Sequence, residues 1–188
     1  LFAMADGADP VLLVTPADQA VVNEAAFGAA LARAVRIAAQ GGFVVLGVVP
    51  DRPETGFGYI RCESCDASEV DARAVLEFVE KPDAETAQSY LATGSYFWNS
   101  GMFVVRASLW LKTLQRFRPD IEAATQAAWQ GRSADPPFLR PDAALFANIP
   151  SQSVDYAVLE KCPQDANAEI SMMALDAGWS DLGAWDAV

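Results

Sequence analysis

The stretch 11-VLLVTPADQAVVNEAAFGAALARAVRIAAQGGFVVLGVV-49 decides the fold, because it contains two buried strands with a helix between them. VLLVT (11–15) and FVVLGVV (43–49) are short, continuously apolar runs rich in β-branched residues, a pattern typical of buried parallel strands. Asn23 can cap an alanine-rich helix that runs to about Ala39, and Gly41-Gly42 can end it. A strand, a helix and a strand in succession predict an α/β domain with a largely parallel sheet.

The rest of the chain continues this alternation, and we expect one domain over residues 1–188. Further strands are predicted at 74–80, 102–106 and 169–181, and helices at 84–91, 107–117, 119–130 and 153–161. Residues 131–150 carry several prolines and indicate a connector with a short helix at 141–147. Turn-rich segments around 55–100 predict mixed hairpins inserted into the sheet.

Composition excludes several classes of function. The formal net charge of −12 argues against a nucleic-acid-binding protein and against a basic membrane anchor. No apolar run approaches the roughly 18–20 residues of a transmembrane helix, and no signal peptide is recognisable. The chain contains no histidine, which excludes Ser-His-Asp, Cys-His and histidine-based metal sites within it. We therefore expect a cytoplasmic protein whose chemistry uses carboxylates, lysine, arginine, backbone amides or an oxygen-liganded metal ion.

The three cysteines are an odd number and do not form a secreted disulfide framework. Cys62 and Cys65 form a CxxC pair, and together with Cys162 they would need a carboxylate to complete a four-ligand zinc site. The pair lies between two strand-like runs, whereas a redox CxxC is expected at the start of a helix. A reduced hairpin loop is the default interpretation.

Several charged side chains follow directly after strand-like runs. Asp18 follows VLLVTPA, Glu80-Lys81 ends AVLEFVE, and Asp181 ends the run 169–180. Ligands of α/β sheets bind outside the carboxyl ends of the strands, so these residues could meet in one site. Two aspartates there could hold one Mg²⁺, which takes one or two protein carboxylates and leaves its other positions to water and phosphate. A turn or helix-capping role for each aspartate stays open.

Two of the three lysines, Lys81 and Lys161, each follow a glutamate. Pro82 fixes the backbone behind Lys81, and neighbouring residues of a strand point to opposite faces. Glu80 and Lys81 at a frayed strand end could therefore reach two different ligand groups. Glutamate suits a sugar hydroxyl and lysine suits a phosphate. The open alternative is a pair of solvated side chains.

The glycine-containing segments TGFGYI (55–60) and GSYFWNSGMF (94–103) match no standard phosphate loop. As turns, they would use glycine for positive φ angles. As ligand loops, they would use Gly58 for close backbone approach and Asn99 as a donor and acceptor for hydroxyl groups. Asp155 in SVDYAVLEK could likewise sit in the first turn of a helix or supply a third acidic group near a metal.

Six motifs taken together resemble the mannose-1-phosphate guanylyltransferases, in particular the bacterial type that is often fused to a phosphomannose isomerase domain. In chain order they are PADQ (16–19), PETGFGYI (53–60), FVEKP (78–82), YFWNSGMF (96–103), SVDYAVLEK (153–161) and GWSDLGAWDAV (178–188). The resemblance implies a Rossmann-like sugar-nucleotidyltransferase fold with an inserted β-hairpin sugar-binding lobe at roughly 51–105. It implies that GTP and mannose 1-phosphate react to give GDP-mannose and pyrophosphate.

The resemblance also assigns roles to residues. Asp18 and Asp181 match the family's Mg²⁺-binding aspartates, and Lys81 matches its contact to the sugar phosphate; these three form the expected catalytic set. The expected sugar-binding positions are Glu80, for a hydroxyl group, Gly58 and Asn99. Asp155 and Lys161 belong to a motif that lines the same cleft.

Two departures from the family pattern qualify the implied activity. Gln19 stands where the family has histidine, next to the expected metal aspartate. The family's glycine-rich N-terminal nucleotide loop has no counterpart here, so we expect a part of a longer protein that binds nucleotide poorly by itself. An unpaired sheet edge could then bind a partner or a second copy, giving a homo-dimer. There are two alternatives to the guanylyltransferase. One is a non-catalytic sugar-phosphate-binding remnant, and the other is a sister transferase that uses another nucleotide or another hexose.

Overall fold

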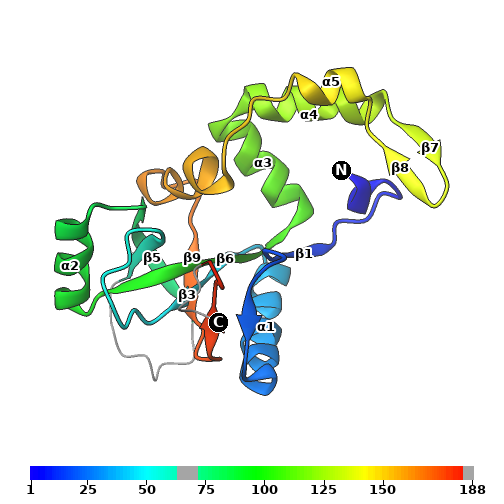
Figure 1. The fold of residues 1–188 in the computed structure, drawn as a ribbon. Helices are drawn as coiled ribbons and strands as arrows, with labels where there is room; N and C mark the ends of the chain where they lie inside the picture. Colours follow the sequence, from blue (N-terminus) through cyan, green and yellow to red (C-terminus); the bar gives the residue numbers. More distant parts are fainter. Residues whose placement is uncertain (63–71, 184–188) are drawn as a thin grey trace.

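The computed structural model describes residues 1–62 and 72–183, which form a layered α/β body with a projecting arm (Figure 1). A six-stranded sheet lies at the centre of the body among these residues. Its strands, in spatial order, are β1 (Val11–Val14), β6 (Tyr96–Arg106), β3 (Phe43–Val48), β9 (Ser171–Ala174), β5 (Arg73–Glu80) and β4 (Gly58–Cys62).

The predicted α/β class is confirmed, but the sheet is mixed rather than largely parallel. β6 lies between β1 and β3 and is antiparallel to both, while β3 and β9 are the parallel neighbours in the described part of the sheet. The eleven residues of β6, YFWNSGMFVVR, also let it pair antiparallel with β4, so this strand contributes three antiparallel pairings to the sheet. The segment 94–103, expected as a loop, is therefore strand from Tyr96 onward.

Helices cover both faces of the sheet, as the strand–helix alternation predicted. α1 lies on one face, and α3 with two short helical turns lies on the other (Figure 1). The helices of the body are α1 (Glu24–Ala39), α2 (Ala84–Thr93), α3 (Ala107–Phe117), η2 (Asp155–Leu159) and η3 (Cys162–Gln164). Asn23 caps α1 by accepting a hydrogen bond from the backbone N–H of Ala26 at 3.0 Å, as expected from the sequence.

The alternating side chains of β3 fill two separate cores. Phe43 and Val45 pack with α3 and the helical turns, whereas Val44 and Leu46 pack with the alanines of α1. All four side chains are buried. This explains the continuous apolar run in the sequence, since a strand that is covered on both faces cannot show a polar alternation.

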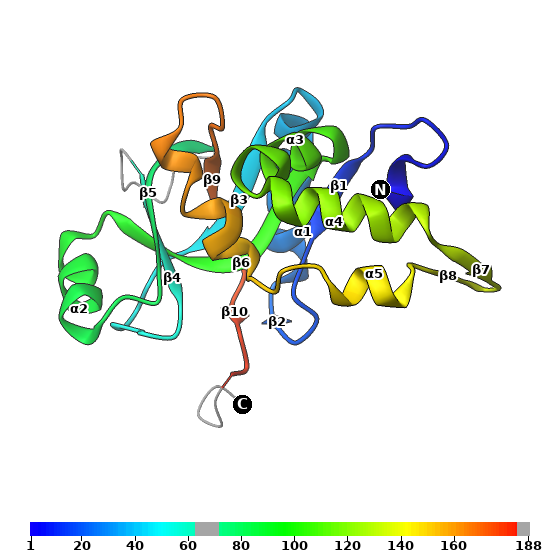
Figure 2. The ribbon, with the colours of Figure 1, turned by 90° about the horizontal axis from the view of Figure 1, so that it is seen from above.

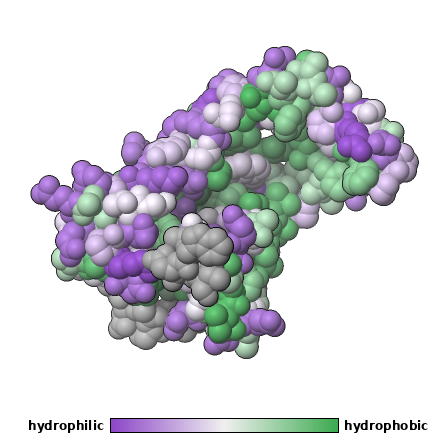
Figure 3. All heavy atoms as spheres, viewed as in Figure 1, coloured by the Kyte–Doolittle hydropathy of each residue, from purple (hydrophilic) through white to green (hydrophobic). Residues whose placement is uncertain are grey.

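The arm consists of α4 (Pro119–Gln130), the hairpin of β7 (Ser133–Asp135) and β8 (Phe138–Arg140), and α5 (Ala143–Ala147). Figure 1 shows it standing away from the sheet, and both Figure 1 and Figure 2 show it near the N-terminal turn η1 (Phe2–Met4). Hydrophobic surface gathers on it in Figure 3, and Phe2, Phe138 and Phe146 are each more than half exposed. The proline-rich segment predicted as a connector thus contains a hairpin as well as the expected short helix.

A two-stranded ribbon outside the central sheet brings distant parts of the chain together. β2 (Ala20–Val21) and β10 (Trp179–Ser180) pair antiparallel, and Figure 2 shows β10 beside β2. At the sheet's own margin, β1 is an edge strand, and its side chains Leu13 and Val14 are 44% and 37% exposed.

The two cysteines among the described residues, Cys62 and Cys162, are both buried, and burial raises the pKa of the Cys162 thiol to about 12. Cys65 lies outside the described residues, so the interpretation of the CxxC pair as a reduced hairpin loop stays a prediction. Over the described ranges, the helices are too short or too polar to cross a membrane.

Candidate active site

A pocket of about 230 Å³ lies where β4, β5 and β6 meet the β2–β10 ribbon. It brings together six of the eight residues predicted from the sequence: Gly58, Glu80, Lys81, Asn99, Asp155 and Asp181. These residues come from parts of the chain that are more than 120 positions apart, and the sheet and the ribbon place them around one space.

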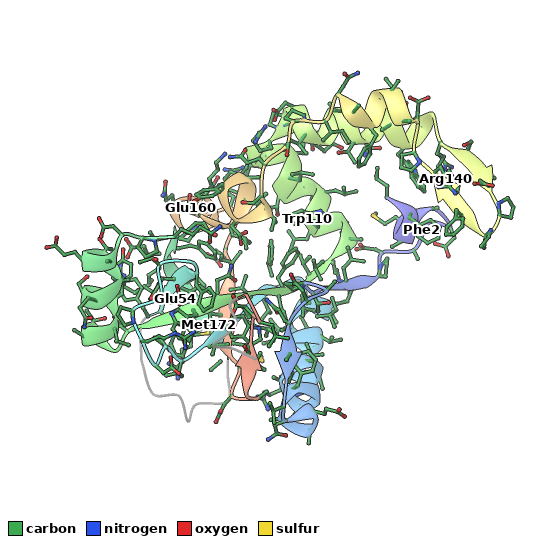
Figure 4. The ribbon with its side chains drawn as sticks, viewed as in Figure 1. Phe2, Glu54, Trp110, Arg140, Glu160 and Met172 are labelled. Atoms are coloured by element: carbon green, nitrogen blue, oxygen red, sulfur yellow. The ribbon has the colours of Figure 1, made fainter. Side chains whose placement is uncertain are left out.

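Glu80 contributes a largely buried carboxyl group to the pocket wall. Its side chain is 9% exposed, and its Oε2 atom is buried without a hydrogen-bond partner. The backbone N–H of Glu80 donates to Oε1 of Glu160 at 2.8 Å, which fixes the end of β5. Figure 4 shows Glu160 on the helical segment that follows η2, beside the sheet. An unpartnered, buried carboxylate oxygen at a pocket wall is suited to accept a hydrogen bond from a ligand hydroxyl.

Gly58 keeps the space in front of that carboxylate open. It pairs with Glu80 across β4 and β5, and a Cβ atom at this position would lie 2.5 Å from Glu80 Oε2 and 3.2 Å from Asn99 Cβ. Contacts of 2.5 Å are shorter than carbon and oxygen tolerate without a bond, so a larger residue would displace the carboxylate. Of the two glycines in TGFGYI, Gly58 is the one at which an added side chain would press on this carboxylate.

Lys81 reaches the same pocket because of its backbone conformation. The strand geometry predicted that Glu80 and Lys81 would point to opposite faces, but Lys81 has a φ of 49°. Its N–H donates to the carbonyl oxygen of Phe57 at 3.2 Å, which holds this left-handed turn. Both side chains therefore line one pocket, with Lys81 Nζ 3.9 Å from Glu80 Oε1 and the lysine side chain 57% exposed.

Asn99 and Asp155 form a second polar pair in the wall. Nδ2 of Asn99 donates to Oδ1 of Asp155 at 3.0 Å, and Oδ1 of Asn99 accepts from the N–H of Gly101 at 3.1 Å. The orientation of the amide is thereby fixed, and one of its two N–H groups is left for a ligand. Asp155 starts η2 and is a partner of Asn99 in the wall.

Two carboxyl groups of this pocket, those of Glu80 and Asp155, have raised pKa values. Burial, assisted by the charges of Asp155 and Glu160 and opposed by Lys81, raises the pKa of Glu80 to about 7. Burial also raises the pKa of Asp155. The folded chain therefore holds a proton on Glu80 in a pH range where the unfolded chain has lost it.

This pKa predicts how stability depends on pH. The protonated form of Glu80 stabilises the fold below pH 4.5, and that contribution is lost as the pH rises through about 7. We expect the free energy of unfolding of Glu80→Gln to fall less than that of the unchanged chain between pH 4.5 and pH 8, as measured by urea denaturation. Glu85→Gln, at an exposed position of α2, is the matched control. An equal fall in both variants would contradict the assignment.

The two aspartates expected to bind a metal are brought near each other by the β2–β10 ribbon. Asp181 directly follows Ser180, which pairs with Ala20, and Asp18 lies two residues before Ala20. Asp181 lines the pocket, whereas Asp18 is exposed and outside its lining. Within the described ranges there is no group of three or more metal-ligating side chains.

The pocket wall also contains residues that the sequence did not single out as functional. Phe57 and Trp179 pack edge to face with ring centres 5.5 Å apart, and they separate this pocket from a neighbouring one of about 310 Å³. Gln19 lines the pocket as well. Each of the three positions belongs to one of the six family-like motifs, but their meeting in one wall depends on contacts between distant parts of the chain. Lys161 follows Glu160 on the adjoining helical segment and is outside the lining.

A family model and similar curated proteins point to the same protein family. A family model described as nucleotidyl transferase matches residues 2–188. The xanthan biosynthesis protein XanB of Xanthomonas campestris pv. campestris (strain B100) is 48% identical over 188 residues, which are 100% of this chain and 38% of that protein. The mannose-1-phosphate guanylyltransferase ManC of Salmonella typhimurium is 47% identical over 182 residues, 96% of this chain and 37% of that protein. The chain thus spans less than two fifths of the length of these relatives.

Solved structures agree in fold. A structure named mannose-1-phosphate geranyltransferase, from Thermus thermophilus, has a TM-score of 0.81 and 32% identity, covering 98% of this chain and 50% of that one. A structure named mannose-6-phosphate isomerase, from Helicobacter pylori, has a TM-score of 0.79 and 29% identity, covering 92% of this chain and 64% of that one. The predicted sugar-nucleotidyltransferase fold is therefore confirmed.

Proposed function

The chain belongs to the nucleotidyl transferase family, and from this membership we propose that it carries the sugar-phosphate half of a mannose-1-phosphate guanylyltransferase site. The reaction would join GTP and mannose 1-phosphate into GDP-mannose and release pyrophosphate. The relatives that bear this enzyme name support the proposal at 41–47% identity. They are longer proteins, and the activity is proposed for the whole protein rather than for this chain alone.

One observation carries the assignment of the sugar phosphate to this pocket. The unpartnered Oε2 of Glu80 and the ammonium of Lys81 line the same pocket from adjacent positions of the chain. A hexose 1-phosphate carries hydroxyl groups, which a carboxylate binds well, and a phosphate, which a lysine binds as a point charge. A ligand with both groups would satisfy the buried oxygen and the exposed cation at once.

In this reaction the protein residues position the two substrates and neutralise the charge of their phosphates. No protein nucleophile is needed. Glu80 and the remaining N–H of Asn99 would hold the sugar hydroxyls. Lys81 would hold the phosphate whose oxygen attacks the α-phosphorus of GTP, in line with the departing pyrophosphate. The phosphate would be attracted to the ammonium of Lys81, and the absence of histidine from the chain is no obstacle to this reaction.

Asp18 and Asp181 would hold Mg²⁺ in this proposal. The ion supplies charge neutralisation to the reacting phosphates when it is bound. The support is the β2–β10 pairing, which brings the two carboxylates to the same end of one ribbon, with Asp181 already in the wall of the pocket. Two protein carboxylates are the number that magnesium commonly takes.

The wider setting is part of the same proposal. We place the protein in the cytoplasm, where nucleoside triphosphates are available. The relatives' greater length supports a further domain, such as the isomerase domain of the bifunctional type. The partly exposed apolar edge of β1 supports association with another strand, in a second copy or elsewhere in the full-length protein.

Two measurements test the proposal. Calorimetry on the 188-residue chain should detect mannose 1-phosphate, with binding of mannose itself weaker by about tenfold or more because Lys81 then has no phosphate partner. The full-length gene product should release pyrophosphate from GTP and mannose 1-phosphate with Mg²⁺, and Asp181→Asn should lower this rate by roughly 100-fold or more.

The outcomes separate the alternatives. Binding of mannose 1-phosphate without any turnover in the full-length protein would indicate a sugar-phosphate-binding protein without activity. Turnover with another nucleotide or another hexose 1-phosphate would indicate a sister transferase. Absence of both binding and turnover would refute the proposal.

A further inference from the structure

Gln19 links three separate elements through its side-chain amide. Its Oε1 accepts a hydrogen bond from Trp179 Nε1 on β10 at 2.9 Å. Its Nε2 donates to the carbonyl oxygen of Ser100 on β6 at 2.8 Å. Gln19 itself directly precedes β2 and follows Asp18. The amide therefore joins the ribbon to the central sheet, across separations of 160 and 81 residues.

The carbonyl of Ser100 is available for this bond because β6 is irregular here. The register between β3 and β6 shifts between Val45 and Gly47, and Gly101 has a φ of 73°. The hydroxyl of the buried Ser100 donates to the carbonyl of Leu46 at 2.8 Å, which anchors the irregular segment in the core. The acceptor used by Gln19 is thus held rigidly by the sheet.

The ribbon needs such an attachment. β2 and β10 share only two residue pairs, which is too short a ribbon for stability in isolation. Its other end is tied by backbone bonds, since the N–H groups of Val22 and Asn23 donate to the carbonyl of Ala177 at 3.1 and 2.9 Å. Gln19 lies at the opposite end, next to the two aspartates.

Building on the proposed function, we propose that Gln19 is a positioning residue that fixes the aspartate-bearing end of the β2–β10 ribbon against the sugar-phosphate pocket. It holds Trp179, two residues before Asp181, and it lies next to Asp18 in the chain. The carboxylates at the ribbon end would otherwise be free to move relative to β6, which carries Asn99 in the pocket wall.

The same contact connects the ribbon to Lys81. The ring of Trp179 packs against Phe57, whose carbonyl oxygen accepts the N–H of Lys81. Loss of the Gln19 bond to Trp179 would thus loosen one wall that the two parts of the site share. The metal-binding part should be affected most, because Glu160 holds the backbone N–H of Glu80 and Gly101 holds the amide of Asn99, and neither partner belongs to the ribbon.

Two substitutions of Gln19 test this role in the 188-residue chain. Gln19→Leu removes both hydrogen bonds at similar size. Gln19→His keeps one acceptor and one donor on a neutral ring, so it is the conservative rescue. By hydrogen exchange without ligands, the amides of β2 and β10 in Gln19→Leu should exchange roughly tenfold faster relative to those of β3. In Gln19→His the change should stay within about threefold.

Metal affinity distinguishes a positioning role from a merely structural role, because a merely structural role would leave the metal affinity unchanged. With Mn²⁺ as an electron-spin-resonance probe and mannose 1-phosphate present, Gln19→Leu should bind the metal roughly tenfold more weakly. Binding of mannose 1-phosphate without metal should change by less than about twofold, and Gln19→His should restore metal affinity.

Three results would overturn the positioning role. The first is an unchanged hydrogen-exchange rate of the ribbon amides in Gln19→Leu, and the second is an unchanged Mn²⁺ affinity in that variant. The third is a loss of mannose 1-phosphate affinity in the absence of metal that equals the loss of Mn²⁺ affinity. If the unchanged chain bound neither Mn²⁺ nor mannose 1-phosphate, the proposed function would fail. The exchange result would then still decide whether Gln19 docks the ribbon.

Discussion

Gly58→Ala is expected to weaken the binding of mannose 1-phosphate by roughly 50-fold or more, because it displaces the carboxylate that receives the sugar. The new Cβ atom would lie 2.5 Å from Glu80 Oε2, so this oxygen has to move. The Cβ atom of Asn99, 3.2 Å away, limits relaxation on the other side. A single methyl group therefore disturbs both side chains that we propose to bind the sugar, without changing any charge.

Calorimetry with mannose 1-phosphate measures this effect, and Gly28→Ala is the matched control. Gly28 lies in α1, where an added Cβ atom meets nothing within 4 Å. That control should bind as before and should gain stability, because alanine favours a helix by about 0.5–1 kcal/mol over glycine. Undiminished binding by Gly58→Ala would show that the sugar lies elsewhere.

Lys81→Met is expected to weaken mannose 1-phosphate binding by roughly 30- to 100-fold, since it removes the cation that faces the phosphate. Methionine is the suitable replacement because any residue with a side chain shares the strain of the φ angle of 49°. Glycine would remove both strain and charge, and the two effects would be mixed. Binding of mannose without its phosphate should change little in Lys81→Met.

Two other lysines complete this experiment. Lys112→Met removes an equal charge from an exposed position of α3 and serves as the control. Lys161→Met asks whether the second Glu-Lys pair takes part, and we expect a smaller loss because Lys161 is outside the pocket lining. A larger loss with Lys161→Met than with Lys81→Met would reverse the assignment.

Local sequence signals predicted the individual elements well. Asn23 and Gly41-Gly42 marked the two ends of α1, and continuous apolar runs marked β3 and the C-terminal part of β6, because these signals act over a few residues. The positions of Glu80 and Lys81 at the end of a strand were also visible in the sequence. The left-handed turn at Lys81 was not, since it depends on an acceptor supplied by Phe57.

The order of the strands could not be predicted from the sequence. β6 separates β1 from β3, and this insertion depends on pairing between residues about 90 positions apart, such as Val11 and Arg106. For the same reason, nothing near Gln19 reveals that its amide meets Trp179 and Ser100. Contacts of this kind follow from the folded sheet and ribbon together, and no short stretch of sequence contains them.

The ribbon also determines when a competent site can appear during synthesis. Trp179 and Gln19 are 160 residues apart, so the contact between them closes one of the longest loops in the chain. Most of the sheet can pair before Trp179 has emerged from the ribosome, whereas Asp18 must wait for its distant counterpart. Nascent chains of increasing length should therefore acquire protease resistance before they acquire metal affinity.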